Sequence, residues 1–132
     1  MSENAPVMIW MSDALGKCLH LNQMLRSFWG VAEGEIPTFD WAQTMHPDDA
    51  AAIGKSMVGA IRSRTSAVIK GRYLNAAGEY RVPHTDARPR VSPTGQFLRM
   101  IGVNVDMTEQ EDARATIAAD LSAMTRLHIT IS

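Results

Sequence analysis

The residues of this sequence that could do chemistry are few and lie far apart. Its four histidines fall on separate expected elements, without the short spacings of a metal site; they are His20, His46, His84 and His128. No nucleophile lies beside a base, and neither a phosphate-binding glycine loop nor a catalytic pair of carboxylates is recognisable. We therefore expect no metal site and no catalysis in this chain.

The single cysteine and two aspartates are the remaining reactive or charged candidates. One cysteine, Cys18, excludes an internal disulfide and a cysteine-based zinc cage, which fits a reducing compartment. Nothing near Cys18 in the sequence would lower the pKa of its thiol. Asp13 is suited to fix a turn, and Asp106 to hold the junction between a strand and a helix.

The bulk composition predicts one globular domain. The chain has 132 residues, 45% hydrophobic residues and a formal net charge of −1, so it can bury a core and shows no global attraction for nucleic acid. No apolar run approaches the ~20 residues that span a bilayer, and the N-terminus lacks the features of a signal peptide. We expect a cytoplasmic module without membrane contact.

The first half of the chain predicts a hairpin followed by helices. Residues 7–12 and 17–21 form two apolar runs around a turn. Asn22 can cap a helix that stops at Gly30, and short helical turns are expected over 31–45. A longer helix should run from Pro47 to about Ser63.

The second half predicts three strands and a long helix. Alternating residues predict strands over 66–74, 79–88 and 97–106, with Pro83 weakening the second of them. Thr108 should cap a helix whose apolar residues follow a short heptad pattern; they are Ile117, Leu121, Met124 and Ile131, with His128 filling a gap. This pattern favours a helix that continues outward as a dimer stalk, and the alternative is a helix packed on its own domain.

Several short motifs, taken in order, resemble a PAS domain of the kind common in bacterial sensor histidine kinases. The motifs are Asp13–x–x–Gly16, Asn22, Trp41, His46–Pro47–Asp48–Asp49, Gly78–Glu79–Tyr80–Arg81 and Gly102–x–x–x–Asp106–Met107–Thr108. The resemblance implies an α+β fold, in which a five-stranded antiparallel sheet of order 2-1-5-4-3 carries helices on one face. It divides the chain into an N-terminal tail (1–5), the PAS domain (6–108) and a C-terminal linker helix (109–132).

By the same resemblance, the chain is a sensory module of a signal-transduction protein, without catalysis of its own. It implies a covalently linked output domain, probable dimers and an optional ligand between sheet and helices. The alternatives are a ligand-free dimerisation module, whose cavity is filled by methionines, and, less favoured, a small enzyme of a similar fold. The methionines are Met8, Met11, Met24, Met45, Met57 and Met100.

Strand alternation and the resemblance together give candidate ligand contacts. Asn104 is the first candidate, because a buried amide must be hydrogen-bonded to Ser12, backbone, water or a ligand. The full set of candidates is Asn104, Trp10, Ser12, Tyr73 and Thr85. The ligand would be an unidentified small molecule. Haem and flavin are not expected. Haem-binding PAS domains commonly carry the axial ligand on the long helix, and no histidine lies between Asp48 and Ser63. Flavin-binding relatives place their reactive cysteine in an Asn-Cys-Arg context, which Cys18 lacks.

The opposite face of the sheet should be apolar, and such a patch usually marks an interface. We expect a homodimer through this face, formed by Ile9, Met11, Ile101, Val103 and Val105. Asp106 and Thr108 lie where the last strand meets the final helix, so they are the predicted residues of signal coupling.

Overall fold

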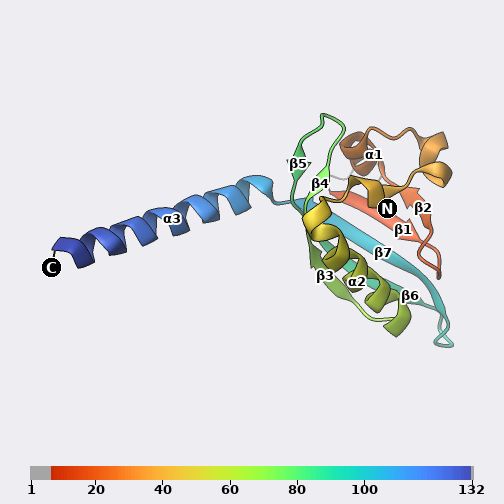
Figure 1. Cartoon of the computed structure of the whole chain (residues 1–132). Helices are drawn as coiled ribbons and strands as arrows, with labels where there is room; N and C mark the ends of the chain where they lie inside the picture. The colour runs from red at the N-terminus through yellow and green to blue at the C-terminus, as the bar shows by residue number, and fades with distance from the viewer. Residues whose placement is uncertain (1–6, 132) are drawn as a thin grey trace.

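The computed structural model describes residues 7–131 of the chain, with side chains up to residue 126. A five-stranded antiparallel sheet lies beneath a layer of helices, and one long helix projects from the end of its central strand (Figure 1). The strands of this sheet are β1 (Met8–Ser12), β2 (Cys18–Leu21), β3 (Ala67–Lys70), β6 (Pro83–Val91) and β7 (Phe97–Asp106). The α+β fold predicted from the sequence is confirmed.

The spatial order of the strands is β2-β1-β7-β6-β3, which is the predicted order once two extra short strands are set aside. Those two, β4 (Tyr73–Leu74) and β5 (Tyr80–Arg81), form a separate ladder. The expected strands over 66–74 and 79–88 are therefore each divided. The second division falls before Pro83, which lacks a backbone N–H and accordingly begins β6 rather than lying within a longer strand.

The first helix, α1 (Gln23–Trp29), begins and ends as its sequence predicts. The Asn22 side chain accepts a hydrogen bond from Leu25 N at 3.1 Å, and its nitrogen donates to Val7 O at 2.8 Å. Gly30 ends the helix in the left-handed conformation, with a φ of 71°. Asn22 therefore caps the helix and also ties it to β1.

Two short 3₁₀ helices, η1 (Glu33–Thr38) and η2 (Trp41–Thr44), lead to the long helix α2 (Pro47–Ser63). His46 caps α2 through its Nδ1, which accepts from Asp48 N at 3.0 Å. Asp49 in the first turn receives two bonds from the Arg72 guanidinium, at 2.8 and 2.9 Å. This pair holds the start of α2 against the segment between β3 and β4, and Figure 1 shows α2 crossing the face of the sheet.

The core lies between the sheet and these helices. Side chains that alternate along the strands point into it, as Ile69 and Tyr73 do with exposed fractions of 4% and 5%. On β7 the inward residues are Met100, Gly102 and Asn104, all of them buried. Strand alternation thus predicted the correct inner face.

The final helix, α3 (Thr108–Ile131), leaves the domain at the end of β7 (Figure 1). Residues 112–122 are all exposed, including Ile117 at 60% and Leu121 at 57%. The side chains of the predicted stripe residues His128 and Ile131, like the predicted tail 1–5, lie outside the described residues. Within the described part of the chain, no helix has both the length and the apolar character needed to cross a bilayer.

Candidate functional site

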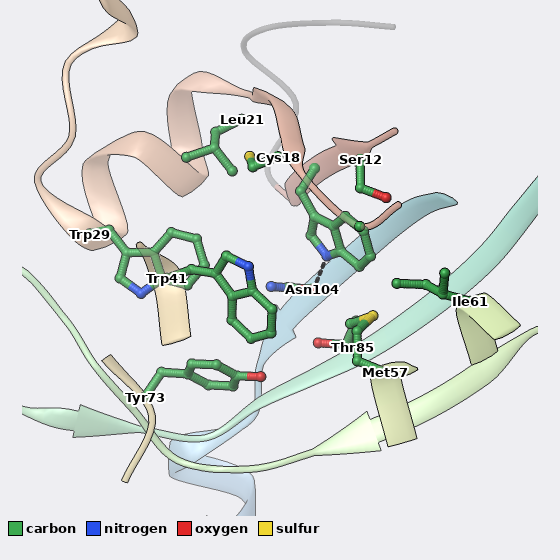
Figure 2. A pocket seen from close by; sticks show the side chains of 12 residues that line it. Ser12, Cys18, Leu21, Trp29, Trp41, Met57, Ile61, Tyr73, Thr85 and Asn104 are labelled. Carbon is green, nitrogen blue, oxygen red and sulfur yellow. Dashed lines mark hydrogen bonds between the residues drawn. The ribbon is translucent and has the colours of Figure 1, made fainter. Parts of the chain in front are cut away.

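A cavity of about 50 Å³ lies between the sheet and the helical layer (Figure 2). Its wall is formed by Trp10, Ser12, Gly16, Cys18, Leu21, Trp29, Trp41, Met57, Ile61, Tyr73, Thr85 and Asn104. The sequence contains three tryptophans, and all three are on this wall. Together with Tyr73, they give the cavity four aromatic side chains.

All five predicted ligand contacts line this one cavity, although they come from four strands. Sequence analysis missed Trp29 and Trp41 as wall residues. Trp29 was assigned to the apolar face of α1, and Trp41 stands in a short 3₁₀ helix, where no periodic pattern shows which way a side chain points. Of the methionines expected to fill the cavity, only Met57 contributes to its wall, and Met24 is 43% exposed.

Trp10 and Asn104 form the fixed centre of the wall. The indole Nε1 of Trp10 donates to Asn104 Oδ1 at 3.0 Å, as the dashed line in Figure 2 shows. The Trp10 ring also covers Gly102, where an added Cβ would overlap the ring atoms Cε2, Cζ2 and Nε1. Asn104 thus pairs with Trp10 rather than with Ser12, whose hydroxyl donates to Asp13 O at 3.0 Å.

Burial affects the two titratable groups on the wall. It raises the pKa of the Tyr73 hydroxyl to about 12, with a smaller contribution from the Asp49 carboxylate. It also raises the pKa of the Cys18 thiol, and outweighs a hydrogen bond with the His20 backbone that lowers it. Both groups are consequently neutral at physiological pH, and the wall contains no Asp, Glu, Lys, Arg or His side chain.

Histidine, cysteine and carboxylate side chains do not gather in threes anywhere in the described part of the chain, so no group there has the composition of a metal site.

A second cluster lies at the end of β7, where α3 begins. Arg81 of β5 donates from Nε to Asp106 Oδ2 at 2.7 Å, and from Nη2 to Glu109 Oε1 at 2.6 Å. These bonds raise the pKa of the Arg81 guanidinium, which thus stays charged. Burial opposes the charged form of Asp106, but hydrogen bonds from Thr108 and Arg81 outweigh it and lower the pKa of the carboxyl.

The sequence predicts that Thr108 caps α3, but its hydroxyl has a different partner in the structure. Its hydroxyl accepts from Val82 N at 2.8 Å, and its own N–H donates to Asp106 Oδ1 at 3.0 Å. Asp106 therefore caps α3, because its carboxylate reaches the first N–H of the helix, while Thr108 joins the helix to the chain between β5 and β6. Met107 N also donates to Val82 O at 2.9 Å.

One further contact joins the outer face of the sheet to α3. His84 Nε2 of β6 lies 3.0 Å from Glu111 Oε1, a distance typical of an ion pair when the imidazole is protonated. Both atoms are buried, and neither forms a hydrogen bond of good geometry with a described residue. Arg114 Nη1 lies 3.7 Å from the same carboxylate oxygen. The first turns of α3 are thus held from both β5 and β6.

The predicted dimer face differs from expectation at one residue. Ile9 pairs with Val103, and Met11 with Ile101, so these side chains share the outer face of the two central strands. Val105 is 44% exposed, whereas Ile9 is only 3% exposed in the single chain and offers little surface to a partner. Alternation along a strand shows which face a residue is on but not whether other parts of the chain cover it.

Comparisons with known proteins identify the family. A family model described as PAS fold matches residues 19–104, so the chain belongs to the PAS family. A crystal structure of a sensory box histidine kinase/response regulator from Burkholderia thailandensis superposes with a TM-score of 0.72 at 18% identity, over 91% of each chain. The PAS domain of the quorum-sensing receptor RpfR from Cronobacter turicensis, in complex with BDSF, gives 0.64 at 19% identity, over 80% of this chain and 97% of that one.

A curated relative is the uncharacterized protein y4lL of Sinorhizobium fredii, which is 26% identical over 113 residues. That match covers 86% of this chain but 14% of the relative. The PAS domain thus corresponds to a small part of a much longer protein in that relative.

Proposed function

We propose that this chain is a sensory module of a bacterial signal-transduction protein. In this proposal, a small molecule in the cavity changes the position of α3, and α3 passes that change to a covalently linked output domain, such as a histidine kinase. The module itself is not an enzyme and works in the cytoplasm. The similarity to a sensory box histidine kinase supports the class of function, and the RpfR PAS domain in complex with BDSF supports ligand binding by a domain of this fold.

The observation that carries the proposal is the position of Asn104 and Asp106 on one strand. Asn104 lines the cavity and bonds to Trp10, while Asp106, two residues on, caps α3 and bonds to Arg81. A shift of β7 that follows a change at Asn104 would move the Asp106 carboxylate relative to Arg81. Since the described side chains beyond Glu111 are mostly exposed, the bonds at the junction decide where α3 points.

The test is the Asp106→Ala substitution in the full-length parent protein. The domain should fold, because the cavity and core clusters do not include Asp106. Output activity should no longer respond to the conditions that change it in the wild-type protein. A response of unchanged size would refute the coupling role of Asp106. The exposed Asp120→Ala in α3 is the matched control, and its response should be retained.

A second candidate, a ligand-free dimerisation module, is favoured by the small cavity and by the apolar stripe on α3. Ile117, Leu121 and Met124 are 60%, 57% and 64% exposed, and their 4-3 spacing is that of a coiled-coil seam. The outer sheet face adds Met11, Ile101, Val103 and Val105, so a second copy of this chain could cover both surfaces.

Sedimentation tests the role of the apolar stripe on α3. We expect a dimer that Leu121→Lys weakens, whereas Ser122→Lys at the neighbouring exposed position does not. A monomer at high micromolar concentration of the unsubstituted chain would exclude a homodimer formed by this chain alone.

A further inference from the structure

The polar groups on the cavity wall are three indole N–H groups, which can only donate, the Asn104 amide, the Cys18 thiol and three hydroxyls, which donate and accept. Asn104 Oδ1 is the one carbonyl oxygen among the wall side chains, and it already accepts from Trp10 Nε1 at 3.0 Å. The Asn104 side chain therefore has its Nδ2 group left to donate. Figure 2 shows this nitrogen pointing into the space toward Trp41.

The other two indole groups are donors without a protein acceptor. Trp29 Nε1 is buried and no atom of the described residues accepts from it, but Figure 2 shows it on the side of its ring away from Asn104, so it does not face the cavity. An indole N–H can only donate, and a buried donor without a partner is unfavourable. Trp41 is placed differently, because Figure 2 shows its indole nitrogen on the edge of the ring that faces the Asn104 side-chain nitrogen. An oxygen acceptor from a molecule in the cavity would pair with groups that the protein leaves unpaired.

The wall also restricts the charge and size of that molecule. It contains no charged side chain. A charged ligand would therefore lose its hydration on entering the cavity and gain no opposite charge in return. The volume of about 50 Å³ is well below the ~150 Å³ of an engineered cavity that holds benzene. Only a few non-hydrogen atoms fit.

We infer that the ligand is a small uncharged molecule with a carbonyl-type oxygen, held beside the indole rings with that oxygen facing the side-chain N–H groups of Asn104 and Trp41. This inference rests on the proposed sensory function and specifies its ligand class. The main rival is a small cation, because tryptophan faces also attract positive charge.

Four planar molecules of equal size separate these classes: acetone, isobutene, acetate and the acetamidinium ion. The readout is the set of indole N–H signals in ¹H–¹⁵N spectra of the chain, which number three because the sequence has three tryptophans. Acetone should shift these signals and the Asn104 side-chain amide saturably at millimolar concentration. Isobutene should bind at least about tenfold more weakly, as expected from the loss of a hydrogen bond.

Variants identify the donors. Tyr73→Phe and Thr85→Val keep the shape of the wall while removing one hydroxyl each. At least one of them should weaken acetone binding by about threefold to tenfold. The control is Tyr80→Phe, since Tyr80 is not on the wall and is 44% exposed. It should leave acetone binding unchanged.

The possible results distinguish the ligand class from the function. Stronger binding of acetamidinium or acetate, or equal binding of isobutene, overturns the ligand class but leaves a ligand-binding cavity. Binding of none of the four overturns the ligand class and the ligand-dependent function together, and leaves the ligand-free dimerisation module.

Discussion

Gly102→Ala is the substitution that tests the geometry of the cavity most severely. Gly102 lies in β7 directly beneath the Trp10 ring, and an added Cβ would overlap three atoms of that ring. The ring must move, and its hydrogen bond to Asn104 must lengthen or break. Overpacking of this kind costs about 1–3 kcal/mol, and loss of the bond adds about 0.5–1.5 kcal/mol.

We therefore expect Gly102→Ala to lower the free energy of unfolding by about 2–4 kcal/mol. Urea unfolding followed by far-ultraviolet circular dichroism measures this difference. The matched control is Gly59→Ala in α2, where an added Cβ meets no atom within 4 Å. That substitution should stabilise the chain by about 0.5–1 kcal/mol, because alanine favours a helix interior over glycine.

A double-mutant cycle identifies the cause. In a Trp10→Ala background the added Cβ has no ring to displace, so Gly102→Ala should cost less than about 1 kcal/mol there. An equal cost in both backgrounds would show that the Trp10 ring does not lie on Gly102 and would refute the described centre of the cavity wall.

Three further predictions concern charged groups and the thiol. Arg72 holds the pKa of Asp49 at about 2, below its ordinary 3.8, so this pair stabilises the fold above pH 3.8 and the contribution is lost as the pH falls through about 2. In acid unfolding, the free energy of unfolding of Asp49→Asn should therefore fall less than that of the wild-type chain between pH 3.8 and about 2. Parallel curves of this free energy against pH would contradict the pairing. Arg81→Gln should destabilise the fold by about 1–3 kcal/mol in urea, whereas Arg88→Gln, at an exposed ion pair, should cost clearly less. Equal costs would refute the role of the α3 junction. Because burial raises the pKa of the Cys18 thiol, a disulfide reagent at pH 8 should label it more slowly in the folded chain than in urea, and equal rates would refute its burial.

The sequence predicted the sheet well because its signals are local. Asn22 and Gly30 mark the two ends of α1, and Pro47 marks the start of α2. Alternation assigned Tyr73 to the inner face, and alternation together with the family resemblance did so for Asn104. The division of the expected strand 79–88 at Pro83 was predicted only in part. The missing N–H of proline predicts a weak point in the strand, but not that a new strand begins there.

The contacts that define the site depend on tertiary packing and could not be predicted residue by residue. Asn104 was expected to bond to Ser12, backbone, water or a ligand, yet its oxygen accepts from Trp10, whose ring takes the space that a side chain at position 102 would need. The partnership of Arg81 with Asp106 joins residues 25 positions apart, and no local pattern encodes it. The burial of Ile9 was missed for the same reason.

Amide hydrogen exchange at the start of α3 tests most directly whether the cavity is linked to the outgoing helix. The comparison is between Asn104→Ala, on the cavity side of β7, and Val105→Ala, on its outer face. We expect Asn104→Ala to speed exchange of the Glu111 N–H, which bonds to Met107 O at 2.8 Å, several-fold more than Val105→Ala does. Unchanged exchange at Glu111 in Asn104→Ala, with the Trp10 indole signal displaced, would contradict the link between cavity and helix.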